Sequence, residues 1–161
     1  MTPTLHLLCG KMAAGKSTLA ARLAAEPSTV LISEDRWLKR LYPDEMLSVA
    51  DYVRCAARLR GPMGEHVSAL LAAGLSVVLD FPANTLANRA WMRGLYEAAG
   101  AGHRLHLLEA DDALCKSRLH ARNAAGAHEF APTDAQFELI TSHFAPPTPE
   151  EGFEVVVHRQ G

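Results

Sequence analysis

Eight consecutive residues near the N-terminus have the composition of a loop that binds phosphate. They match the pattern G-x-x-x-x-G-K-[ST] and run Gly10, Lys11, Met12, Ala13, Ala14, Gly15, Lys16, Ser17. An apolar run over 5–9 precedes them and a helix-forming run over 17–25 follows, so the loop is expected to join a strand to a helix. Glycines let backbone N–H groups wrap a polyphosphate, and a helix N-terminus attracts negative charge. The pattern therefore predicts nucleotide binding.

The last residues of this motif have separate expected roles. Lys16 is expected to reach the β- and γ-phosphates as a mobile positive charge, and the Ser17 hydroxyl to ligate Mg²⁺. The predicted nucleotide contacts extend to Thr18.

An acidic pair follows the second predicted strand, which covers 30–33. Transfer of a phosphoryl group to an alcohol needs a carboxylate that accepts the hydroxyl proton, and Asp35 is placed for that role. Glu34 is the second candidate for the base. The alternative interpretation makes Asp35 the N-cap of a helix over 36–41, a position that favours aspartate on its own.

A second acidic residue, Asp80, ends the apolar strand predicted over 75–80. In this position after a phosphate-binding loop, Asp80 is predicted to hold Mg²⁺ through water, although capping aspartates also end many strands. Asn84 and Arg89 come next along the chain and are candidates for contacts to the acceptor or to a phosphate. A solvated helix face is the alternative for Arg89.

Two arginines, Arg118 and Arg122, lie four residues apart in a helix predicted over 111–124 and so share one face. Guanidinium groups pair well with phosphate oxygens, so both are predicted to contact the nucleotide from a lid over about 115–132. A solvated cationic stripe is the alternative. The proline-rich segment 145–152 is expected either to frame the nucleotide base or to be an ordinary surface connection.

Further candidates lie between the second and third predicted strands, where an acceptor pocket would have its walls. Arg58 and Trp37 are assigned to this pocket as substrate contacts, together with Asp35. A place in the core is the alternative for Trp37.

Short β-rich runs alternate with helical runs along the whole chain. Strands are predicted over 5–9, 30–33, 75–80, 104–109 and 153–158, and helices over 17–25, 50–60, 64–73, 87–99, 111–124 and 133–142. This alternation predicts one α/β domain over 1–161, with a five-stranded parallel sheet covered by helices on both faces. In such a sheet the ligand lies at the carboxyl ends of the strands.

Composition restricts the classes of partner. The net charge of −2 lacks the basic excess of a general nucleic-acid binder. The apolar run at 5–9 is too short for a signal peptide or a membrane span, which favours a cytoplasmic protein, either monomer or homodimer. Cys9, Cys55 and Cys115 are expected to be buried free thiols, and the eight histidines have no metal-ligand spacing.

Taken together, the loop at 10–17, Ser33-Glu-Asp35, Leu79-Asp80-Phe-Pro-Ala-Asn84 and Arg118-x3-Arg122 resemble the P-loop kinases of the zeta-toxin-like or AAA_33 type. Relatives of that group include chloramphenicol phosphotransferase and the 5′-hydroxyl kinase domain of polynucleotide kinases. The resemblance implies ATP as donor, Asp35 as general base, Lys16 and Ser17 at the phosphates, and Arg122, more loosely Arg118, as the lid arginine. Where polynucleotide kinases have an arginine shortly after the base, this chain has Trp37-Leu38, which disfavours a nucleic-acid acceptor.

The leading hypothesis is an ATP- and Mg²⁺-dependent kinase that phosphorylates a hydroxyl of a small molecule. Two alternatives stay open: a 5′-hydroxyl kinase of nucleic-acid ends, and an ATPase that acts as a nucleotide-dependent switch. The sequence does not name the acceptor.

Overall fold

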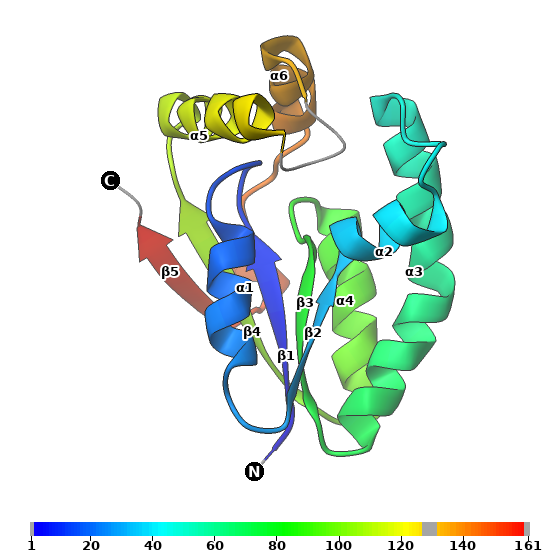
Figure 1. Cartoon of the computed structure of the whole chain (residues 1–161). Helices are drawn as coiled ribbons and strands as arrows, with labels where there is room; N and C mark the ends of the chain where they lie inside the picture. The colour runs from blue at the N-terminus through cyan, green and yellow to red at the C-terminus, as the bar shows by residue number, and fades with distance from the viewer. Residues whose placement is uncertain (1, 127–131, 160–161) are drawn as a thin grey trace.

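Five parallel strands form the central sheet in the order β2-β3-β1-β4-β5 (Figure 1). The computed structural model describes residues 2–126 and 132–159. The strands are β1 (Thr4–Cys9), β2 (Thr29–Ser33), β3 (Ser76–Pro82), β4 (Gly102–Glu109) and β5 (Val155–Arg159). The helices are α1 (Lys16–Ala24), α2 (Glu34–Leu41), α3 (Val49–Ala72), α4 (Leu86–Ala99), α5 (Asp112–Ala125) and α6 (Asp134–Ser142), with a 3₁₀ turn, η1, at Pro149–Glu151. The predicted α/β fold with a five-stranded parallel sheet is confirmed.

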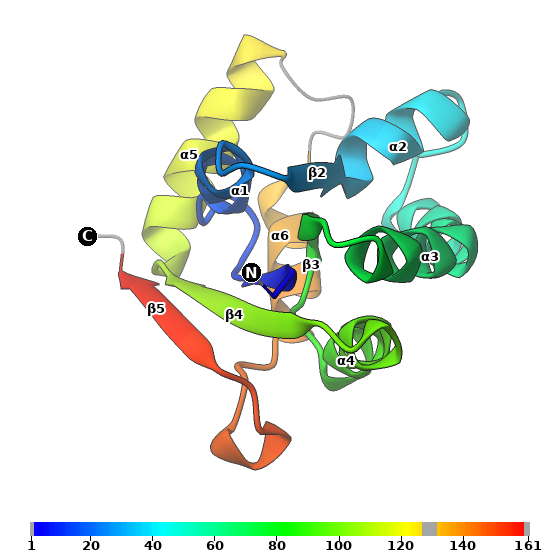
Figure 2. The same ribbon diagram turned by 90° about the horizontal axis from the view of Figure 1, so that it is seen from below.

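Side chains alternate across the strands and fill two separate cores. Leu5, Leu7 and Leu79 pack with the apolar sides of α3 and α4, whereas Leu8 and Leu108 pack with α1, α5 and α6 on the other face. Figure 2 shows the two helical layers on opposite sides of the sheet. Burial of the inner strands on both faces explains their nearly continuous apolar sequences.

One helix differs from the sequence prediction. Separate helices were expected over 50–60 and 64–73, but α3 continues through Pro62. Proline removes one helical hydrogen bond, and apolar burial outweighs this loss because Leu59, Met63 and Val67 are buried on the same helix face. Gly64 lets α3 approach α4 closely, since a Cβ there would lie 3.2 Å from Leu95 and 3.3 Å from the Trp91 indole.

Other local predictions can be checked in the same way. The side chains of Asp111 and Thr133 cap the N-termini of α5 and α6. The three cysteines are buried and free, as predicted. None of the helices in the described ranges is long and apolar enough to cross a membrane.

Candidate nucleotide and acceptor site

The phosphate-binding loop, residues 10–17, connects the carboxyl end of β1 to the start of α1. Gly15 precedes the helix with φ of 104°, and Ala13 also has a positive φ of 64°. No side chain caps the first turn of α1, so its N–H groups are directed at the loop without a protein acceptor. Gly10 lies against the next strand, because a Cβ there would be 3.2 Å from Leu108 Cβ. The N–H groups of the first turn of α1 therefore form a cradle suited to an anion.

Lys16 is folded back onto the loop. Its Nζ donates to the carbonyl oxygens of Gly10 (2.5 Å) and Lys11 (2.9 Å). Burial lowers the pKa of Lys16, and the negative charges of Asp80 and Asp35 oppose that shift. An ammonium group held by two carbonyls near two carboxylates can exchange those partners for phosphate oxygens with little rearrangement.

Ser17, in α1, and Asp80, in β3, are hydrogen-bonded to each other. The Ser17 hydroxyl donates to Asp80 Oδ2 at 3.1 Å. Burial raises the pKa of Asp80, the Ser17 hydrogen bond lowers it, and Asp35 raises it further. One hydroxyl and one carboxylate are hard oxygen ligands, and Mg²⁺ usually takes its remaining ligands from water and phosphate. The pair therefore fits Mg²⁺, although no described residues form a cluster of three or more His, Cys, Asp or Glu that could hold a metal.

Asp35 lies in the first turn of α2, directly after β2. The N-cap of this helix is Ser33, whose Oγ accepts from the Arg36 N–H, so the alternative that Asp35 is the N-cap is wrong. Ser33 pairs with Asp80 in the register of β2 and β3, which brings the start of α2 beside the Ser17–Asp80 pair. The Asp35 side chain is exposed. It is thus free to meet a molecule that approaches the loop.

Glu34 is buried beside this exposed carboxylate. Its Oε1 accepts from the Tyr52 hydroxyl on α3, while its Oε2 has no hydrogen-bond partner among the described residues. Burial raises the pKa of Glu34 to about 7, whereas the Tyr52 hydrogen bond and the charge of Arg60 lower it. Because Glu34 is 2% exposed, it cannot reach an acceptor as Asp35 can.

Asn84 and Arg89 do not face an acceptor, which corrects the sequence assignment. Asn84 Oδ1 accepts from Gly10 N–H and its Nδ2 donates to Gly10 O, both at 2.9 Å. Both polar atoms of the Asn84 amide are thereby used to hold the first residue of the phosphate-binding loop. Asn84 is therefore a support of the loop.

Arg89 is 0% exposed and lies in the core. Its guanidinium forms a bidentate pair with Glu151 (2.7 and 3.2 Å) and donates to the carbonyl oxygens of Ala83 (3.0 Å) and Ala145 (2.7 Å). Four of its five N–H groups are used in this way, and its full burial keeps the guanidinium away from a phosphate in solvent. Burial also rules out the alternative of a solvated helix face. Arg89 instead joins β3 to the segment 145–152.

The two predicted lid arginines lie on α5 above the loop (Figure 1). Arg118 Nη1 donates to Ala13 O at 3.4 Å, so this side chain reaches the phosphate-binding loop. Arg122 is one turn further along, and its buried Nε has no hydrogen-bond partner in the described ranges. The predicted lid over 115–132 includes 127–131, which lie outside the described residues.

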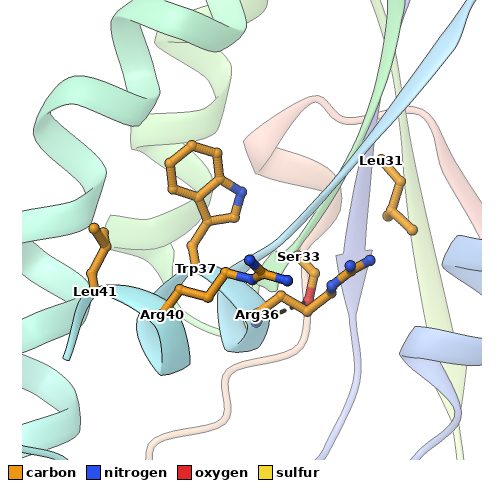
Figure 3. A pocket seen from close by; sticks show the side chains of 6 residues that line it. All are labelled: Leu31, Ser33, Arg36, Trp37, Arg40 and Leu41. Atoms are coloured by element: carbon orange, nitrogen blue, oxygen red, sulfur yellow. Dashed lines mark hydrogen bonds between the residues drawn. The ribbon is translucent and has the colours of Figure 1, made fainter. Parts of the chain in front are cut away.

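Two hollows lie near the carboxyl ends of the strands, one beside the phosphate-binding loop and one beside α2. The larger, of about 520 Å³, lies at the carboxyl ends of β4 and β5, and its lining includes Lys11, Asp111, Phe144, Pro146 and Arg159. The smaller, of about 270 Å³, is lined by Leu31, Ser33, Arg36, Trp37, Arg40 and Leu41 (Figure 3). Trp37 is 42% exposed, so the alternative that places it in the core is wrong. Arg58 is exposed on α3 and lines neither hollow.

Sequence reasoning missed one cluster entirely. His6 Nδ1 and His106 Nε2 are 3.0 Å apart, and His106 Nδ1 and His158 Nε2 are also 3.0 Å apart. The three residues belong to β1, β4 and β5 and form a hydrogen-bonded chain across half of the sheet. Only strand register brings together residues 52 and 100 positions apart, and no local pattern carries that information.

Comparisons with known proteins agree with this geometry. A candidate kinase from Chloroflexus aurantiacus J-10-fl has a similar structure, with a TM-score of 0.79 at 22% identity, covering 98% of this chain and 85% of that one. An APS kinase from Mycobacterium tuberculosis, solved with AMPPNP and APS, gives 0.62 at 20% identity over 97% and 88%. A gluconokinase from Sinorhizobium meliloti 1021 gives 0.61 at 18% identity over 97% and 83%. Likeness at these identities shows the fold alone.

No curated protein matches the chain at the level of sequence. The model of the AAA_33 family, described as an AAA domain, matches residues 5–147 and so includes the phosphate-binding loop, Asp35, Asp80 and both arginines of α5. The chain therefore belongs to the AAA_33 family and has the fold of the P-loop kinases.

Proposed function

We propose that this protein is an ATP- and Mg²⁺-dependent phosphotransferase that moves the γ-phosphoryl group of ATP to a hydroxyl of a small molecule. One observation carries the proposal: an exposed carboxylate, Asp35, lies beside both the Ser17–Asp80 pair and Lys16. A nucleotide switch needs the loop and the metal ligands, whereas a kinase also needs a base that meets an acceptor. Asp35 supplies that additional group.

The donor occupies the phosphate-binding loop in this proposal. Lys16 exchanges its two carbonyl partners for β- and γ-phosphate oxygens, and Ser17 with Asp80 holds Mg²⁺, which neutralises phosphate charge. Arg118 and Arg122 contact the phosphates from α5. The larger hollow, with Phe144 and Pro146 in its wall, takes the nucleobase.

The transfer step uses the chain's own carboxylate. Asp35 accepts the proton of the acceptor hydroxyl as the oxygen attacks the γ-phosphorus, and the bond from that phosphorus to the β,γ-bridging oxygen breaks. The products are the phosphorylated acceptor and ADP. Lys16 and the arginines of α5 stabilise the charge that spreads over the equatorial oxygens.

The test is a mass measurement of products after incubation with Mg-ATP and a panel of hydroxylated acceptors: sugars, nucleosides, aminoglycosides, chloramphenicol-like alcohols and 5′-hydroxyl oligonucleotides. The expected result is an added phosphate on a small molecule in the wild type, with a loss of at least about 10²-fold in Asp35→Asn. Arg22→Gln, on the exposed side of α1, is the matched control and should keep full activity. ATP hydrolysis at equal rates in the wild type and Asp35→Asn, with no phosphorylated product, would contradict the proposal.

A further inference from the structure

The smaller hollow, beside α2, combines positive charge with an exposed aromatic ring. Arg36 and Arg40 are one turn apart on α2, and both side chains are exposed. Neither side chain forms an ion pair with any residue in the described ranges. Two neighbouring guanidinium groups without a carboxylate partner, on a chain of net charge −2, form a local site for an anion.

The same hollow has an apolar wall. Leu31 is 37% exposed, Trp37 42% and Leu41 51%, so three large apolar side chains face solvent around the two arginines. Figure 3 shows both arginine side chains extending from α2 toward the strand that carries Leu31, with the Trp37 indole above them. Arginine with an aromatic face and an apolar edge suits a ligand that carries an anionic group next to a ring.

The hollow lies next to the proposed catalytic base. Ser33 and Arg36 line it, and Asp35 lies between these two residues in the chain, in the first turn of α2. Because Ser33 is paired with Asp80 in the register of β2 and β3, this turn also lies beside the Ser17–Asp80 pair. A ligand held in the hollow can therefore extend across this turn and bring a hydroxyl to Asp35.

We propose that the smaller hollow is the acceptor subsite and that the acceptor is an anionic molecule, with a phosphate, sulfate or carboxylate held by Arg36 and Arg40 and a ring held against Trp37. This inference rests on the proposed function, because it assigns the molecule that Asp35 deprotonates. The volume of the smaller hollow, about 270 Å³, suits a small molecule as the acceptor.

The first experiment measures binding without turnover. In the Trp91→Phe variant Trp37 is the single tryptophan, because the chain has two. Its fluorescence is titrated with three matched pairs that differ in the anion: uridine 3′-monophosphate against uridine, glucuronate against glucose, and 4-(hydroxymethyl)benzoate against benzyl alcohol. We expect saturable quenching by at least one ring-bearing anion, binding at least about tenfold tighter than its neutral partner, and loss of that preference in Arg40→Gln. Equal affinities within every pair, or no response to any of the six, would overturn the inference.

The second experiment separates this inference from the proposed function. With an acceptor that the enzyme is found to phosphorylate, Arg40→Gln should raise the acceptor KM about tenfold, while kcat and the ATP KM stay within twofold of the wild type. The control, Arg22→Gln, should leave all three constants unchanged. Transfer to neutral and anionic acceptors with equal kcat/KM would contradict the anion subsite and would still support the proposed kinase activity. Selective anion binding at Trp37 with no transfer to any compound would support the subsite and contradict the kinase.

Discussion

The histidine chain of His6, His106 and His158 predicts that the protein loses stability in acid. Each N···N contact of 3.0 Å needs one N–H donor and one free lone pair. Three neutral imidazoles satisfy both contacts, and one added proton is tolerated when His106 donates in both directions. A second proton leaves two N–H groups facing each other and breaks one contact.

The free-energy change follows from the central residue. His106 is 4% exposed, and burial, followed by the charges of His6, His158 and Arg104, lowers its pKa from 6.5 to about 4. Burial and the charge of Arg104 also lower the pKa of His6. A histidine whose pKa is lowered by folding binds protons more readily in the unfolded chain, so acid favours unfolding. The stability that depends on neutral His106 is therefore complete above pH 6.5 and is lost as the pH falls toward 4. At pH 4.5 the loss from His106 is about 2–3 kcal/mol.

The assay compares the wild type with His106→Leu, which removes the titration, by urea unfolding followed by circular dichroism between pH 7.5 and 4.5. We expect the free energy of unfolding of the wild type to fall by about 2–3 kcal/mol more than that of the variant across this range, a difference of about 1 M in the urea midpoint. His66→Gln, an exposed histidine on α3, should follow the wild type. Parallel pH profiles for the wild type and His106→Leu would refute the reasoning.

Three further predictions concern the residues around the phosphate-binding loop. Arg89→Leu should lower the free energy of unfolding by about 3–5 kcal/mol in urea, because it leaves the Glu151 carboxylate unpaired; a cost below about 1 kcal/mol would show that the pair is not structural. Asn84→Ala should raise the ATP KM about tenfold with stability reduced by less than about 2 kcal/mol, because Gly10 loses both of its amide partners; an unchanged KM would contradict the supporting role. Asp80→Asn should raise the Mg²⁺ concentration for half-maximal ATP turnover at least about tenfold, since one anionic ligand is lost, and an unchanged Mg²⁺ dependence would place the metal elsewhere.

The local sequence was enough to predict the order of the five strands and the phosphate-binding loop. The spacing of apolar residues, the positions of the glycines and the G-K-[ST] ending are all short-range properties. They were enough to predict the strand, the loop and the start of α1 within the first 17 residues. The carboxyl ends of parallel strands lie at one edge of the sheet, and this rule predicts that residues following β2 and β3, such as Asp35 and Asp80, lie near the same ligand. The continuous helix through Pro62 could not be predicted this way, because its stability comes from packing on α4 and the sheet.

The tertiary structure decided what individual polar side chains do. Arg89 was predicted to contact a ligand and Arg36 was not, yet Arg89 is enclosed by Glu151 and two carbonyl oxygens while Arg36 lines an open hollow. Likewise, Asn84 looked like an acceptor contact and instead holds Gly10. Sequence spacing gives the direction of a side chain from its own helix or strand, but burial, ion pairing and strand register depend on residues far away in the chain. The sequence by itself therefore determined the fold and the position of the phosphate-binding loop in it, and only the packed structure decided which charged groups remain available to a ligand.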